Sequence, residues 1–118
     1  MTAFHKEKKL VDNLVEKTLS GKISWSDSPF GDEPWTMIGD HRVSLEEGRS
    51  ANGSTLIYVV IRDNELREID RFHDENLDQT NQSPIYFKIL KDLYLTSNRQ
   101  AKGADKAIDD ILKGMDNL

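Results

Sequence analysis

Six consecutive apolar residues, Leu56 to Ile61, constrain the fold of this sequence more than any other feature. Most of them are β-branched or aromatic, which is typical of a β-strand. A strand with one solvated face alternates apolar and polar residues, so an unbroken apolar run indicates a strand that is covered on both faces. We therefore expect this run to be the central and most buried strand of a sheet.

The residues after this run predict a β-hairpin that spans Ser54 to Phe72. Asp63 and Asn64 suit its turn, because their short side chains hydrogen-bond nearby backbone groups and tolerate a positive φ. The returning strand is expected from Leu66 to Phe72, and it is more polar than the first strand.

A second hairpin is predicted from Trp35 to Glu46. Gly39 and Asp40 suit its two-residue turn, because glycine readily takes the positive φ that such turns need at their first central position. The turn then sets the register of the two strands and places Trp35 opposite Ser44.

Three polar segments, residues 26–34, 47–54 and 73–83, are expected to be loops or surface connections. The first contains two prolines and a glycine, and the second contains two glycines, an asparagine and two serines. These residue types are typical of turns. The third segment has Leu77 as its single apolar residue.

Three further segments have the apolar spacing of amphipathic helices. The first covers residues 3–19. The second begins with Ser83 as N-cap and Pro84 at the first helical position, and it ends before Gly103. The third presents an apolar face made of Ala107, Ile108, Ile111, Leu112 and Met115.

Together these elements predict the α+β class: an N-terminal helix, an antiparallel sheet of about four strands in two hairpins, and two C-terminal helices. A length of 118 residues fits a single domain over residues 1–118. Because the Leu56–Ile61 strand is apolar on both sides, we expect helices on both sheet faces, or a partner subunit on one of them.

Composition narrows the classes of function. The chain has no cysteine, and no apolar run approaches the roughly 20 residues of a membrane span. We therefore expect a cytoplasmic protein without disulfides, zinc–thiolate sites or membrane contact. Residues 1–13 lack the apolar core of a secretory signal. A formal net charge of −5 disfavours nucleic-acid binding.

The end of the chain, ILKDLYLTSNRQAKGADKAIDDIL, and the segment GKISW after the first helix resemble small single-domain bacterial proteins of uncharacterised function. In those proteins a helix with an LY…RQA.G pattern precedes a short helix with a D.aID.IL pattern. The resemblance implies one helix, four strands and two helices, and it carries no activity across. The matching residues are Leu93, Tyr94, Arg99, Gln100, Ala101, Gly103, Asp105, Ile108, Asp109 and Ile111.

The sequence contains no catalytic, cofactor-binding or metal-binding signature, and no histidine pair has metal-ligand spacing. An enzyme alternative is a small hydrolase or metal-dependent enzyme that uses His41, His73 and the acids near them. It requires these side chains to converge in one pocket.

A second alternative is single-stranded nucleic-acid binding by stacking and charge, through strand arginines and Trp35. Acidic residues interleave with these arginines and cancel most of their positive field. The arginines are Arg42, Arg62, Arg67 and Arg71, and the interleaved acids are Glu65, Glu68 and Asp70.

We expect instead a non-enzymatic protein-interaction or regulatory domain, such as an inhibitor, an adaptor or an accessory subunit. Aromatic and arginine residues dominate binding energy where an interface removes them from water. The candidate contact residues are therefore Phe30, Trp35, Tyr58 and Arg42. For Phe30 and Trp35, a position in the core is the alternative.

The sequence does not identify a protein partner, but a second copy of the chain is one candidate. Three apolar helix stripes exceed what one narrow sheet face accommodates. The terminal helix, with Ile111 and Leu112, is therefore expected to pack against its copy about a two-fold axis. The alternative folds this helix back onto its own domain at Gly103.

Overall fold

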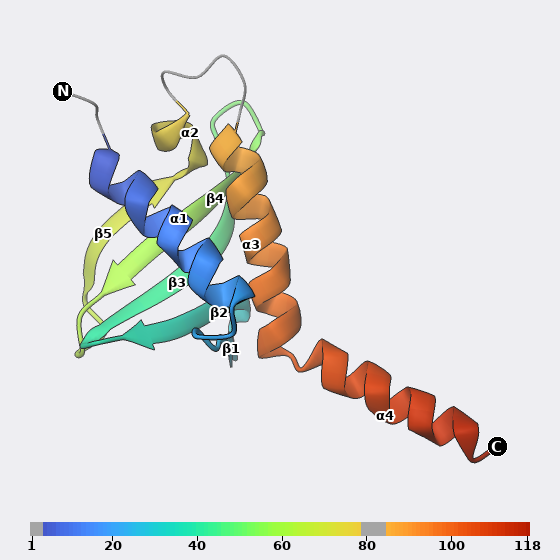
Figure 1. Cartoon of the computed structure of the whole chain (residues 1–118). Coiled ribbons are helices and arrows are strands. Elements are labelled where there is room, and N and C mark those ends of the chain that lie inside the picture. The colour runs from blue at the N-terminus through green and yellow to red at the C-terminus, as the bar shows by residue number, and fades with distance from the viewer. Residues whose placement is uncertain (1–3, 79–84) are drawn as a thin grey trace.

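The computed structural model describes residues 4–78 and 85–118, and these form an α+β fold (Figure 1). An N-terminal helix precedes an antiparallel sheet, and the C-terminal helices follow it, as expected. The elements are α1 (His5–Leu19), β1 (Ser26–Ser28), β2 (Gly31–Ile38), β3 (His41–Arg49), β4 (Thr55–Arg62), β5 (Glu68–His73), α2 (Asp74–Leu77), α3 (Ile85–Ala101) and α4 (Ala104–Asp116).

The five strands form one sheet in the order β1-β2-β3-β4-β5, with every neighbouring pair antiparallel. The predicted apolar run forms β4, and its Val59 and Val60 side chains are both 0% exposed. Because adjacent residues of a strand point to opposite faces, both faces of β4 are covered, as expected. β4 is however the fourth strand of five, so its expected central position is wrong.

The β2–β3 hairpin has the predicted register. Trp35 lies opposite Ser44, and Ile38 lies opposite His41 at the turn. Gly39 has a φ of +61°, which is the positive value that the two-residue turn was expected to need.

The expectation of a loop over residues 26–34 is wrong, and this accounts for the fifth strand. Ser26 pairs with Trp35 and Ser28 pairs with Gly31, so β1 and the start of β2 form a tight hairpin. The Ser28 hydroxyl accepts the backbone N–H of Phe30 at 3.2 Å inside this turn. The three residues of β1 carry no apolar side chain, so hydrophobic patterning gave no sign of it.

Two other strand boundaries differ from the sequence prediction. β3 continues to Arg49, which pairs with Thr55, so the loop expected from residue 47 shortens to a turn around residues 50–54. β5 begins at Glu68 because Leu66 has a φ of +67° and belongs to the turn. The carboxylate of Asp63 accepts the backbone N–H of Arg67 at 2.9 Å and closes that turn.

The surface connection expected after β5 contains the short helix α2. Its Leu77 side chain is only 1% exposed and belongs to the hydrophobic core, so this segment anchors the chain between β5 and α3. The helix start predicted at Ser83 and Pro84 lies outside the described residues.

α1 and α3 lie over the same face of the sheet (Figure 1). Their buried side chains meet the strand residues that point to that face, and the indole of Trp25 sits between the two helices. The Trp25 Nε1–H donates to Thr18 Oγ1 of α1 at 3.0 Å, and its backbone N–H donates to Gln100 Oε1 of α3 at 2.7 Å. The core comprises Val11, Leu14, Trp25, Val43, Leu45, Ile57, Val59, Phe72, Leu77, Leu90, Leu93 and Tyr94.

Candidate protein-interaction site

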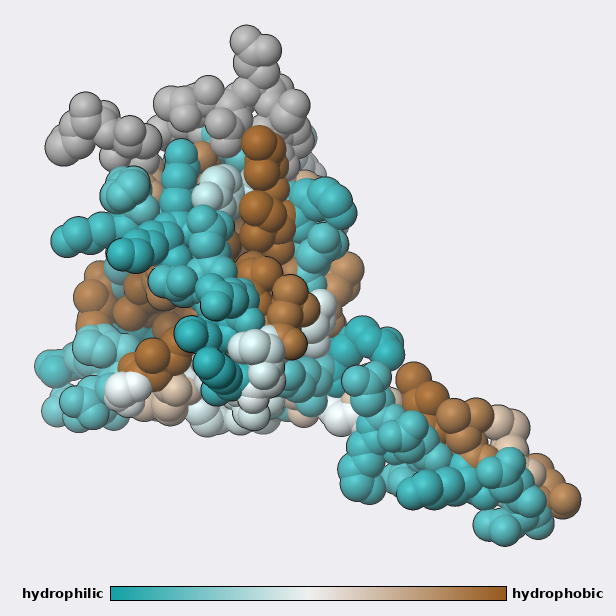
Figure 2. Space-filling view, viewed as in Figure 1, coloured by the Kyte–Doolittle hydropathy of each residue, from teal (hydrophilic) through white to brown (hydrophobic). Residues whose placement is uncertain are grey.

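The terminal helix α4 leaves the body of the molecule instead of packing on it (Figure 1). None of its residues is buried, and Ile111 and Leu112 are 61% and 52% exposed. Ile108 and Met115 extend the same apolar stripe. Figure 2 shows the apolar residues of α4 gathered along one side of the helix, with polar residues on the other. An apolar stripe without cover is the usual mark of a binding surface.

The two edges of this stripe differ in charge. With 3.6 residues per turn, Asp105, Asp109 and Asp116 fall along one edge of the stripe, whereas Ala107 and Gly114 fall along the other. Asp105 lies 3.9 Å from the Arg99 guanidinium of its own chain. Within residues 4–78 and 85–118, Asp109 and Asp116 form no ion pair. The helix therefore presents an acidic edge and an uncharged edge.

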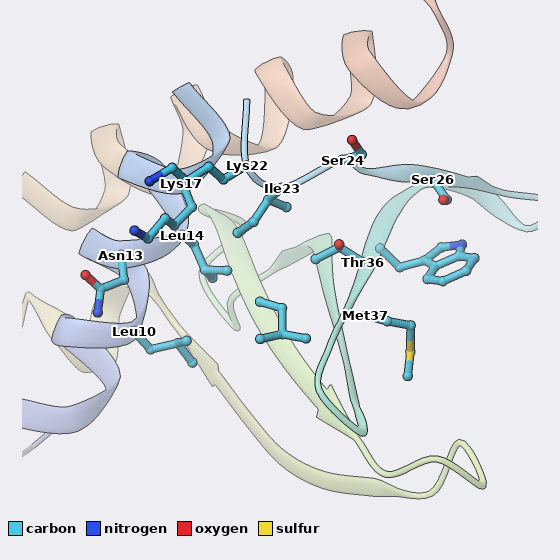
Figure 3. A pocket seen from close by; sticks show the side chains of 12 residues that line it. Leu10, Asn13, Leu14, Lys17, Lys22, Ile23, Ser24, Ser26, Thr36 and Met37 are labelled. Atoms are coloured by element: carbon cyan, nitrogen blue, oxygen red, sulfur yellow. The ribbon is translucent and has the colours of Figure 1, made fainter. Parts of the chain in front are cut away.

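A second unfilled apolar surface is a groove between α1 and β2 with a volume of about 880 Å³ (Figure 3). Leu10 and Leu14 reach into it from α1, and Ile23 reaches into it from the segment after the helix. β2 supplies the opposite wall, where Ile38 points to the helix side and is 43% exposed, and Met37, which lies on the other sheet face with Arg42, borders the groove at the strand edge. Apolar concavities of this size are typical of ligand or peptide sites.

The groove exists because β1 is short. β1 pairs with β2 only at Trp35 and Gly31, so the outer edge of residues 36–38 has no strand partner in the described chain. Strand edges are where proteins commonly accept another chain. The hairpin with β1 thus closes one end of the β2 edge and leaves the other end open to the groove.

Lysines mark one side of the groove. Lys17 extends from α1 and Lys22 from the segment after it, whereas the β2 wall from Trp35 to Ile38 carries no charged residue. Within the part of the chain that the structure describes, no carboxylate forms an ion pair with either lysine. The groove therefore has a basic rim on one side and an uncharged rim on the other.

The sheet face opposite the helices brings Trp35 and Arg42 together. The register places them on the same face, and the Arg42 guanidinium lies 3.9 Å from the centroid of the Trp35 ring, in cation–π contact. Partial burial and the neighbouring Arg62 charge lower the pKa of Arg42. Trp35 is half-buried, so part of its side chain packs against the protein and part contacts solvent.

The same face continues across β4 and β5, where arginines are paired with acids. Glu46 lies 3.6 Å from Arg62 and 3.5 Å from Arg71, and Glu68 lies 2.9 Å from Arg71. Arg71 also lies 5.3 Å from the centroid of the Tyr58 ring. Within the described chain, these long side chains, and not a helix, shield the outer face of β4.

Phe30 and the histidines stand apart from these surfaces. Phe30 is 87% exposed at the β1–β2 turn, so the core alternative for it is wrong in the described chain.

The two strand histidines lie far apart. His41 is the first residue of β3, whereas His73 pairs with Tyr58 near the other end of β4. Counted along β4, the two residues are offset by about five strand positions, or roughly 17 Å along the strand. No group of three His, Asp or Glu residues suited to a metal ion occurs within the described ranges.

Apart from Phe30, the contact residues predicted from sequence divide into two surfaces. Trp35, Arg42 and Tyr58 share one sheet face, and Ile111 and Leu112 share the α4 stripe. The groove was missed, because sequence patterns did not show where α1 would lie relative to the edge of β2. The lone alternation of Ile23 and Trp25 between α1 and β1 was its only sequence signal.

No protein-family model, curated protein or solved structure matches this chain. Over the described residues, none of the helices combines the length and the apolar character that crossing a lipid bilayer requires.

Proposed function

We propose that this protein is a non-enzymatic protein-interaction domain, acting as an inhibitor, an adaptor or an accessory subunit in the cytoplasm. The observation that carries the proposal is the apolar stripe of α4, which includes Ile111 and Leu112 and has no cover in the described chain. Exposing such a stripe to water is costly, at about 25 cal/mol for each Å² of apolar surface. A partner that covers it recovers this free energy.

The charge of α4 favours a protein over a membrane as that partner. Helices that lie on membranes carry lysine and arginine beside their apolar face, because the lipid surface is anionic. α4 carries four aspartates (Asp105, Asp109, Asp110 and Asp116) against two lysines (Lys106 and Lys113), a difference of two negative charges. An anionic lipid surface would repel this helix.

The partner that we propose is a second copy of the chain, so that the protein is a homodimer through α4. Symmetric dimers are the commonest oligomers, and an exposed stripe on each copy supplies two equivalent contacts about one axis. Each contact centres on the pair Ile111 and Leu112.

Light scattering of the full chain tests this proposal. The wild type should have twice the 13.5 kDa mass of one chain at micromolar concentration. Replacing Ile111 with Asn and Leu112 with Gln should give a folded monomer. A matched control replaces Lys106 and Lys113, on the polar side of α4, with Gln and should stay dimeric. A monomeric wild type, or a dimer that survives the Ile111 and Leu112 changes, overturns the proposal.

A second candidate, single-stranded nucleic-acid binding on the open sheet face, is favoured by the contact between Arg42 and Trp35. The pairing of Arg62 and Arg71 with Glu46 removes most of the remaining positive charge from that face. Titration of an oligothymidine against tryptophan fluorescence tests it. Binding that is lost on Arg42→Ala supports this candidate, and an unchanged spectrum rejects it.

A further inference from the structure

We infer that α4 of one copy seats in the groove between α1 and the open edge of β2 of a second copy, and that the two copies exchange these helices reciprocally. The inference rests on the proposed function, because it names the surface that receives α4. It differs from the expectation that the two α4 helices pack on each other.

The apolar surfaces match in kind. The stripe of α4 offers unbranched and branched aliphatic side chains, among them Ile111, Leu112 and Met115, and all of them are about half exposed or more. The groove offers Ile23, which is half-buried, and Ile38 on its β2 wall, which is 43% exposed. Both surfaces are uncovered in the described chain, and joining them removes both from water at once.

The charges on α4 and on the groove are opposite in sign, and each set lies along one side of its surface. Asp109 and Asp116 lie along one edge of the α4 stripe, and Lys17 and Lys22 lie along one side of the groove. All four are without an ion pair inside the described chain. The other edge of α4 and the other wall of the groove are uncharged. A helix placed with its aspartates toward the lysines pairs its acidic edge with the basic rim and its uncharged edge with the uncharged wall. The reversed placement forms neither pairing.

The α3–α4 junction directs the helix away from its own groove. Gly103 has a φ of +69°, its N–H donates to Gln100 O at 3.0 Å, and its carbonyl accepts the N–H of Ala107 at 3.0 Å. The N–H of Lys102 donates to Asn98 O at 3.0 Å. These bonds hold the two-residue connector on both sides, so α4 keeps the outward direction that Figure 1 shows. A second copy then supplies the groove.

Another apolar hollow fits α4 less well. It lies between α1 and α3, has a volume of about 290 Å³ and is lined in part by Leu19 and Ile89. Its one charged lining residue is Asp92, which would face the aspartates of α4. Size and charge therefore both favour the α1–β2 groove as the receiving surface.

Engineered cysteines test the seat directly, because the chain has none of its own. Full chains that carry Ile38→Cys in the groove are mixed with full chains that carry Leu112→Cys in α4, and the mixture is mildly oxidised. We expect a mixed disulfide between the two chains, since a disulfide needs Cα atoms within about 7 Å. A disulfide between two Leu112→Cys chains alone overturns the groove seat and leaves the α4 dimer intact.

A chain that carries both cysteines separates exchange from fold-back. A disulfide within one chain, at monomer mass on a denaturing gel, would show that α4 folds back on its own groove, against the inference. If the wild type is itself a monomer by light scattering and no cross-link forms, the proposed function fails together with the inference.

Charge reversal adds an independent test of the rims. Lys17→Glu with Lys22→Glu should weaken the dimer by about tenfold or more, as loss of close charge pairs does. Adding Asp109→Lys and Asp116→Lys to this variant should restore most of the affinity.

The matched control reverses Lys6 and Lys9, which are exposed, form no ion pair in the described chain and lie outside the groove, and it should leave the dimer unchanged. Circular dichroism confirms that each variant is folded. Equal weakening by the control and the groove variant, or failure of the aspartate reversals to restore affinity in folded protein, contradicts the seat.

Discussion

The Asp74 carboxylate accepts the backbone N–H of Ile57 through Oδ1 at 2.7 Å, in a site where Asp74 is only 3% exposed. β5 ends at His73, opposite Tyr58, so Ile57 is the next residue of β4 beyond the end of the ladder. The side chain of Asp74 thus replaces the strand partner that Ile57 lacks. It also fixes α2 to the end of β4. The Leu77 side chain of α2 then packs into the core.

Burial of this carboxyl predicts a dependence of stability on pH. Loss of solvation raises the pKa of Asp74 above its ordinary value of 3.8, against the opposing effect of the Ile57 hydrogen bond. Between the unfolded and folded pKa values the folded state therefore binds more protons. The contribution of Asp74 to the free energy of unfolding is greatest below pH 3.8 and falls as pH rises through the folded pKa.

Asp74→Asn should remove this pH dependence and keep an oxygen that accepts the Ile57 N–H. Urea unfolding from acid to neutral pH should show the variant gaining stability relative to wild type as pH rises from about 3.8 upward. Asp74→Ala is the matched control, because it also lacks the carboxyl but leaves a buried N–H without a partner, and it should be less stable than Asp74→Asn by about 1–3 kcal/mol at every pH. A constant difference between wild type and Asp74→Asn over this range contradicts the raised pKa.

The two faces of β4 should respond differently to a buried charge. Val59 pairs with Leu45 and Phe72 in the core beneath the helices, so Val59→Asp places a carboxylate where nothing can pair with it. We expect this variant to be unfolded at 25 °C, because such a charge costs several kcal/mol. Circular dichroism measures the loss of structure.

Val60→Asp should be milder, although Val60 is equally buried. Val60 lies opposite Ser44 and Arg71, and the Arg62 guanidinium donates to Ser44 Oγ at 3.0 Å. A carboxylate at position 60 therefore lies beside two arginines. We expect a folded protein with a lowered urea midpoint, and Val60→Asn as a neutral control should be less stable than Val60→Asp. Complete unfolding by Val60→Asp would show that this face behaves as an ordinary core.

The Tyr58 ring on the neighbouring strand occupies the space that a side chain at position 48 would need. A Cβ at Gly48 would meet Tyr58 Cε2 at 2.8 Å, which is closer than van der Waals contact allows. Gly48→Ala should therefore destabilise the protein by about 1–3 kcal/mol through overpacking. In a Tyr58→Ala background the same change should cost much less, which a double-mutant cycle in urea measures. Additive effects of the two changes contradict the contact.

Much of this fold follows from local patterns in the sequence. The register from Trp35 to Ser44 is set by a two-residue turn, whose geometry depends only on Gly39 and Asp40. The burial of β4 follows from six adjacent apolar residues, and α4 follows from its 3.6-residue period. These features are local, so the sequence pattern alone predicts them.

The features that sequence patterns missed depend on contacts between distant segments. β1 has no apolar side chain, and only pairing with Gly31 and Trp35 makes it a strand. Asp74 and Leu77 form α2 because the end of β4 and the core lie beside them. The groove depends on where β1 stops along β2. None of these contacts leaves a periodic trace in the chain.

The hydrogen bond from Trp25 to Thr18 predicts a strong coupling between α1 and the segment that follows it. The indole Nε1–H is buried, and Thr18 Oγ1 at 3.0 Å is its acceptor. Thr18→Val keeps the shape of the side chain but leaves this N–H unpaired, and it should lose about 1–3 kcal/mol of unfolding free energy. In a Trp25→Phe background there is no N–H to leave unpaired, so Thr18→Val should be nearly neutral. Urea unfolding followed by circular dichroism gives all four free energies, and equal losses in the two backgrounds would show that the bond contributes nothing to stability.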